Sequence, residues 1–217
     1  MTETSSLFAA AAADDAEGLL AAMGERMNVI PPVNENGETL FLFCTYRNKA
    51  KCVEALIRRG GLTLHEAAAA GDVARIEACV LSAPWTVQTL SGDGWTALHL
   101  AAFVGQDAAL LALLERGANP RQWARAFDAN LALHAACAGR RLRRDTFARL
   151  IAATGDPDIA QKGGYTALMI AAGNGFPDAV DALLAAGAAR SRKTVDGKAA
   201  ADFARDRGHT ELAARLA

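Results

Sequence analysis

The 217-residue sequence predicts an all-α fold in which helical hairpins stack into an elongated solenoid. Three observations support this prediction. A segment of about 33 residues recurs along most of the chain, each copy holds two helix-forming stretches, and the copies share characteristic residues at fixed places. Because no single hairpin can bury its own apolar side, its stability must come from packing against its neighbours.

The clearest copies of the repeat begin at Gly94 and Gly164. Residues 94–105 read Gly-Trp-Thr-Ala-Leu-His-Leu-Ala-Ala-Phe-Val-Gly, and residues 164–175 read Gly-Tyr-Thr-Ala-Leu-Met-Ile-Ala-Ala-Gly-Asn-Gly. With the residue at the leucine position as marker, seven units are predicted, 34, 23, 34, 35, 35 and 33 residues apart. The markers are Leu7, Phe41, Leu64, Leu98, Leu133, Leu168 and Ala201.

Each shared residue has a physical reason. The threonine hydroxyl is placed to cap the first helix of the unit, because it accepts a hydrogen bond from a free backbone N–H. The paired alanines keep this helix slim enough for close packing, and the glycine that follows favours the left-handed conformation that ends it. These positions hold Thr39, Thr96 and Thr166, the alanine pairs 101–102 and 171–172, and Gly71, Gly105 and Gly175.

These residues closely resemble the ankyrin repeat, and the resemblance covers nearly the whole chain. It implies short β-turn fingers that project between the helical hairpins, and a concave face that binds another protein. The sequence departs from the family pattern at Ala97 and Ala167, where proline is usual, and at Leu42, where histidine is usual. The 23-residue step from Phe41 to Leu64 is about ten residues short of the family period. We therefore expect one finger to be absent there.

The missing finger predicts a division of the chain into two parts. Residues 1–60 are expected to form an N-terminal cap with degenerate repeats, and residues 61–217 to form regular repeats that end in a polar C-terminal cap. We expect the first part to be a semi-separate block. Insertions lengthen one finger at residues 121–128 and one turn between helices at residues 140–145.

Composition and charge argue against several classes of function. The chain carries 23 basic and 24 acidic side chains, so its formal net charge of -1 offers no overall field to attract nucleic acid or an anionic membrane. No segment fits a signal peptide or a membrane span. The four cysteines show no paired spacing, which favours a reducing compartment. We expect a cytoplasmic monomer without a cofactor.

No motif points to catalysis or to metal binding. His65, His99 and His134 share one repeat position, where the imidazole is expected to bond to backbone and to brace neighbouring turns. Ligand clusters such as His-Glu-x-x-His, phosphate-binding glycine loops and nucleophile elbows are absent from the sequence. The sequence therefore predicts neither an enzyme nor a metal site.

Large side chains occupy the positions that the resemblance assigns to the concave binding face. In the family, these are the residue after the first glycine and the two residues before the helix-ending glycine. Tryptophan, tyrosine and arginine dominate the energetics of protein interfaces. The predicted partner-binding residues are Trp95, Phe103, Val104, Tyr165, Asn174, Tyr46, Arg47 and Trp123. We expect Trp95, Phe103 and Val104 to form one apolar patch with Tyr165.

Two alternatives remain open for these side chains and for a nearby charge cluster. Trp95 and Phe103 either meet a partner or fill a groove against the finger that holds Trp123 and Phe127. A run of four arginines either faces water or contacts an acidic patch on a partner. The run consists of Arg140, Arg141, Arg143 and Arg144.

The leading functional prediction is a non-catalytic scaffold or adaptor that binds a partner protein on the concave face. A preformed rigid surface would keep the entropic cost of binding low. The alternative is a bacterial effector or an immunity-type inhibitor that uses the same face to block a target protein.

Overall fold

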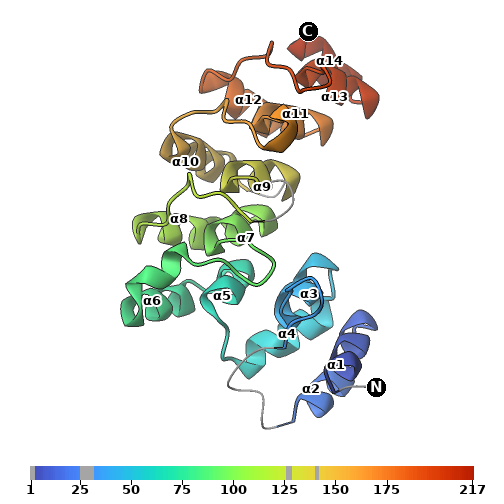
Figure 1. Cartoon of the computed structure of the whole chain (residues 1–217), viewed down its shortest axis with the longest axis vertical. Coiled ribbons are helices and arrows are strands. Elements are labelled where there is room, and N and C mark those ends of the chain that lie inside the picture. The colour runs from blue at the N-terminus through green and yellow to red at the C-terminus, as the bar shows by residue number, and fades with distance from the viewer. Residues whose placement is uncertain (1–2, 25–31, 126–128, 140–141) are drawn as a thin grey trace.

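The computed structural model describes residues 3–24, 32–125, 129–139 and 142–217. Within these residues, fourteen α-helices form seven hairpins that stack along one long axis, with α1 at one end and α14 at the other (Figure 1). The predicted all-α solenoid is confirmed. All seven marker residues fall in the first helix of their hairpins.

The first helix of each hairpin is called inner here and the second outer. The pairs are α1 (Glu3–Ala12) and α2 (Ala16–Met23), α3 (Leu40–Tyr46) and α4 (Ala50–Arg59), α5 (Leu64–Ala70) and α6 (Val73–Ser82), α7 (Ala97–Val104) and α8 (Asp107–Glu115), α9 (Ala132–Gly139) and α10 (Arg144–Thr154), α11 (Ala167–Gly173) and α12 (Pro177–Ala185), and α13 (Ala200–Asp206) and α14 (Thr210–Leu216). Short 3-10 helices η1 (Pro84–Gln88) and η2 (Lys162–Gly164) precede the fourth and sixth hairpins.

Capping residues set where the inner helices begin and end. Thr39, Thr96 and Thr166 each accept a hydrogen bond from the backbone N–H three residues later, so the predicted threonine caps are confirmed. In the third hairpin the cap is Thr63, one position later in the repeat, and it forms a capping box with Glu66. The caps fix the register in which each hairpin meets the next.

One continuous apolar core runs through the whole stack, from Leu7 in α1 to Leu216 in α14. The inner helices supply fully buried leucines, such as Leu98 and Leu168, and paired alanines that let neighbouring helices approach closely. Each hairpin is thus covered by its neighbours, as the stacking argument requires.

The repeated histidines tie each unit to the next. The Nε2–H groups of His65, His99 and His134 donate to backbone carbonyl oxygens of the following finger, at 3.0, 3.1 and 2.9 Å. Burial lowers the pKa of both His99 and His134 to about 4, so these rings are neutral near pH 7. Their predicted structural role is confirmed.

The fingers are present between most hairpins. Antiparallel bridges close three of them, from Val33 to Thr39, from Leu90 to Thr96 and from Ala160 to Thr166. By contrast, α4 ends at Arg59 and α5 begins at Leu64, so the link between them is too short for a finger.

The short link changes the position of the N-terminal hairpins. In Figure 1, α3 lies beside α5, and α4 lies away from the row of outer helices formed by α6, α8 and α10. The inner helices line the concave side of the resulting curve. Across the described residues, no helix combines the length and apolar character needed to cross a bilayer.

Candidate partner-binding surface

Three of the predicted binding residues come together on the concave side, from two units that are not neighbours in sequence. Trp95 follows the finger of the fourth unit, Phe103 lies near the end of α7, and Tyr46 ends α3 in the second unit. The ring centroids of Trp95 and Phe103 are 5.4 Å apart, and those of Tyr46 and Phe103 are 6.1 Å apart. Both pairs meet edge to face, a favourable arrangement for aromatic rings.

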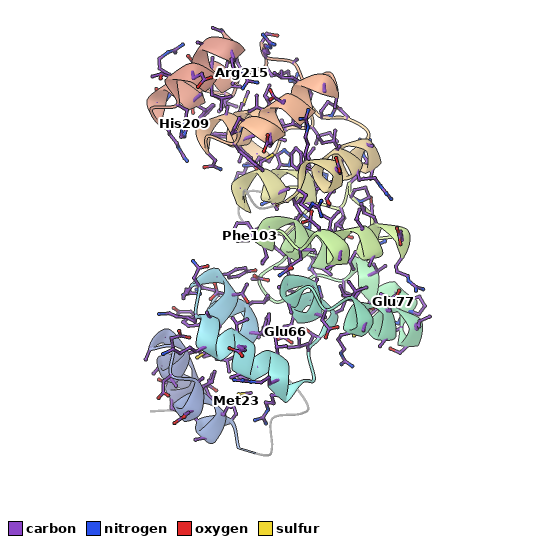
Figure 2. The ribbon with its side chains drawn as sticks, turned by 180° about the vertical axis from the view of Figure 1, so that it is seen from behind. Met23, Glu66, Glu77, Phe103, His209 and Arg215 are labelled. Atoms are coloured by element: carbon purple, nitrogen blue, oxygen red, sulfur yellow. The ribbon has the colours of Figure 1, made fainter. Side chains whose placement is uncertain are left out.

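These rings and one carboxylate surround a small concavity of about 240 Å³, which we call the aromatic hollow. Its lining residues are Tyr46, Asp93, Trp95 and Phe103. Figure 2 shows Phe103 at the end of α7 that faces the N-terminal hairpins. The aromatic residues are half-buried, so part of each ring borders the hollow. Within the described residues, Phe103 packs against both Trp95 and Tyr46, and Tyr46 is a residue that the sequence interpretation did not pair with either of them.

A hydrogen bond crosses the hollow and joins the second unit to the fourth. The Tyr46 hydroxyl donates to Asp93 Oδ2 at 2.6 Å, and the Ser91 hydroxyl donates to the other carboxylate oxygen. Burial and the neighbouring Asp93 carboxylate raise the pKa of Tyr46 well above its ordinary value. The phenol therefore stays protonated and remains a donor.

The fingers of the second and fourth units touch directly. A Cβ atom on Gly92 would overlap the carbonyl oxygen of Gly37, and a Cβ atom on Gly37 would overlap the carbonyl oxygen of Gly92. The corresponding positions in the sixth and seventh fingers hold Lys162 and Val195. The repeat itself does not require glycine at this position, since other fingers carry a side chain there. The contact with the second finger explains why position 92 is a glycine.

A second, neutral concavity of about 150 Å³ adjoins the aromatic hollow, since Tyr46 and Phe103 line both. Val104, Asn48 and Gly139 form part of its wall. The C-terminal ends of α3, α7 and α9 therefore share one irregular surface. Val104 lines this concavity beside Phe103, its neighbour in the predicted patch.

Arg47 lies at the rim of this region and is held in place. Its guanidinium makes a 3.0 Å ion pair with Glu38 and lies 3.9 Å from the centroid of the Phe43 ring. Glu38 also accepts a hydrogen bond from the Asn34 amide at 2.6 Å. The exposed Arg47 thus has its charge matched by a neighbouring carboxylate.

The remaining predicted residues lie further along the stack. Tyr165 packs against Phe203 of the last unit, with 5.5 Å between ring centroids. Asn174 donates to the carbonyl oxygen of Cys137 at 3.2 Å and accepts from Arg207 at 2.9 Å. These contacts place Tyr165 and Asn174 in a second group, with the α9 hairpin between it and the aromatic hollow (Figure 1).

The long finger of the fifth unit carries Trp123, which is 44% exposed. Phe127, the other ring expected there, lies outside the described residues, as do Arg140 and Arg141. Arg143 and Arg144 are exposed.

The sequence interpretation missed Asp93 as part of the surface. Its only sequence signal is an acidic residue beside Gly94 at the tip of a finger, and its partner Tyr46 is 47 residues away. A motif search has no means of joining two such positions.

Three of the four cysteines, Cys44, Cys52 and Cys137, are buried. Within the described residues, no group of three or more histidine, cysteine or acidic side chains is arranged to hold a metal ion. Burial raises the pKa of the Cys44 thiol to about 12 and that of the Cys137 thiol further still. These two cysteines are thus poor nucleophiles.

Comparison with known proteins supports the architecture. The family model for ankyrin repeats in three copies matches residues 7–124 and 133–217. A comparison with curated protein sequences gives no match.

Proposed function

Because the chain belongs to the ankyrin-repeat family, whose repeats are protein–protein interaction modules, we propose that it is a non-catalytic scaffold or adaptor. The partner protein binds on the concave side, around the aromatic hollow and the neutral concavity beside it. The observation that supports this proposal most directly is the cluster of half-buried aromatic rings formed by Tyr46, Trp95 and Phe103.

The arrangement of this surface favours recognition. The hollow is held by contacts within the protein, including the Tyr46–Asp93 hydrogen bond, so little order has to be gained on binding. Tyr165, Asn174 and Trp123 provide further contact positions along the stack for a partner that extends past the hollow. We further propose that the protein is a cytoplasmic monomer. We also propose that it binds neither nucleic acid nor membranes, which the balanced charge supports.

Site-specific photo-crosslinking tests the proposed face. A benzophenone amino acid at Val104 reports on the concave side, and the same residue at Leu81, 68% exposed on the outer helix α6, is the matched control. In cells of the native organism, we expect position 104 to crosslink to a defined protein. We expect position 81 not to crosslink to that protein. The same crosslinks from both positions, or a defined product from 81 alone, would overturn the proposed face.

A pair of charge substitutions checks the same point without crosslinking. Val104→Glu should abolish capture of the crosslinked protein, and Leu81→Glu should leave it intact, while both keep the helical circular dichroism of the parent. If the captured protein is an enzyme that loses activity on binding, the chain is an inhibitor, the alternative to a scaffold.

A further inference from the structure

The aromatic hollow combines two features that favour one kind of occupant. Its walls include the rings of Tyr46, Trp95 and Phe103, and its remaining lining residue is Asp93, an acid. Aromatic faces carry partial negative charge and attract cations. An anionic group would be repelled by the carboxylate, and a neutral apolar group would gain nothing from it.

The two charged side chains that act on the Tyr46 hydroxyl beside the hollow, Asp93 and Glu38, are both acidic. Among the described residues, Asp93 accepts hydrogen bonds from two hydroxyl groups and has no basic partner in an ion pair. The nearby Glu38 also contributes to raising the pKa of Tyr46. Arg47 is paired with Glu38, and burial lowers the pKa of His65, which keeps that ring uncharged near pH 7.

The protein already contains one example of the same chemistry. The Arg47 guanidinium lies 3.9 Å from the centroid of the Phe43 ring and pairs with the carboxylate of Glu38. A cation thus lies between an aromatic ring and a carboxylate at the edge of this surface.

We propose that the aromatic hollow receives a cationic side chain, lysine or arginine, from an extended segment of the partner protein. This inference rests on the proposed function and specifies the chemistry of the partner's anchor. At about 240 Å³, the hollow has room for one such side chain and not for a folded element. The residues next to that anchor would then lie over the neutral concavity at Val104 and Asn48.

The last unit offers a natural comparison. The finger residues Asp93, Gly94 and Trp95 correspond to Asp196, Gly197 and Lys198 in the seventh unit. There the lysine takes the place of the tryptophan and pairs with Asp206 at 2.7 Å. Asp196 therefore provides the same charge in the same turn, with a lysine in place of the tryptophan.

Short peptides of defined sequence test the proposal. The chain has three tryptophans, so a Trp85→Phe, Trp123→Phe background leaves Trp95 as the sole fluorescent reporter. The probes are N-acetyl-Ala-Ala-X-Ala-Ala amides, with arginine or lysine at X and with citrulline or norleucine as uncharged counterparts. We expect the charged peptides to bind about tenfold more tightly than the uncharged ones.

Substitutions connect this preference to the named residues. Asp93→Asn keeps the shape of the carboxylate and should reduce the preference to below about twofold, while Asp196→Asn should leave it unchanged. Phe103→Leu keeps an apolar wall without a ring and should also weaken binding of the charged peptides. Melting curves of each variant establish that the fold is retained.

Three results would overturn the proposal. They are equal binding of the norleucine and lysine peptides, a preference that survives Asp93→Asn, and failure of all four peptides to bind at millimolar concentration. Crosslinking from Val104 with failed peptide binding would leave the proposed function standing and remove this inference. Crosslinking from Leu81 alone, with charged peptides still bound, would remove the proposed binding face and leave only the preference of the hollow for cations.

Discussion

The junction between the second and fourth units differs from the regular stretch between the fourth and seventh. In the regular stretch, each finger contacts the finger of the next unit. The backbone N–H of Arg125 donates to the carbonyl oxygen of Gly94 at 2.8 Å, and the backbone N–H of Val195 donates to the carbonyl oxygen of Gly163 at 3.1 Å. At the junction, the second finger meets the fourth finger through Gly37 and Gly92. Loss of one finger therefore brings two distant units together.

The two regions also rely on different interactions. Neutral buried histidines join the units of the regular stretch to the fingers that follow them. The second unit instead uses hydroxyl-to-carboxylate bonds. Thr39 donates to Glu66 of the third unit at 2.7 Å, and Tyr46 donates to Asp93 of the fourth unit at 2.6 Å. The aromatic hollow forms in this irregular region, because there the ring of Tyr46 in α3 meets the ring of Phe103 in α7.

The largest difference between the two regions is expected in how strongly acid lowers their stability. Between pH 6.5 and about 4, the unfolded chain binds protons at His99 and His134 that the folded chain does not, so the free energy of unfolding falls as the pH falls. At pH 5.5 the two sites together should cost about 3 kcal/mol. His65 in α5 also has a lowered pKa, and residues 1–60 contain no histidine, so the loss should be concentrated in α5 to α10.

Hydrogen exchange followed by mass spectrometry at pH 7.5 and 5.5, corrected for intrinsic exchange, measures this loss for each helix. His134→Gln should remove about half of the pH dependence that comes from His99 and His134. Equal loss of protection in α1 to α4 would contradict the assignment to the two histidines.

The sequence was sufficient to predict features that repeat, and insufficient for the contact across the missing finger. Thr96, His99 and Gly105 recur at a fixed spacing and act within one unit or on the next, so their roles follow from the period. The link at Gly60 follows from a short step. The division of the chain at residue 60 into two semi-separate parts stays a prediction.

The aromatic hollow depends instead on the angle at which the second unit meets the fourth, which no periodic signal records. Tyr46 and Asp93 are 47 residues apart, and Thr39 reaches Glu66 over 27 residues. For the same reason, the sequence grouped Trp95 with Tyr165, whereas the structure groups Tyr165 with Phe203. Side chains at equivalent repeat positions share an environment only where the stacking is regular.

A smaller effect is expected from a methyl group placed between the two fingers. Gly92→Ala should destabilise the junction by about 2 kcal/mol, because its Cβ overlaps the Gly37 carbonyl oxygen and the fingers must part. Hydrogen exchange in α3 and α4 should rise accordingly. Lys162→Ala, at the same place in the sixth finger, is the control and should change stability by less than about 0.5 kcal/mol. Equal effects of the two substitutions would show that the fingers do not touch.

The smallest effect is expected from removing one hydroxyl group. Tyr46→Phe keeps the ring contact with Phe103 and removes the hydrogen bond to Asp93, which should cost about 1 kcal/mol in denaturant unfolding. Tyr165→Phe is the matched control in the regular stretch, and should cost less than about 0.5 kcal/mol, because the described residues provide no hydrogen-bond partner for that hydroxyl. Since Asp93 then has one donor fewer, Tyr46→Phe should also tighten binding of the lysine peptide relative to norleucine. If Tyr46→Phe both loses stability and binds the lysine peptide more weakly, the cation contacts the Tyr46 hydroxyl and not the Asp93 carboxylate.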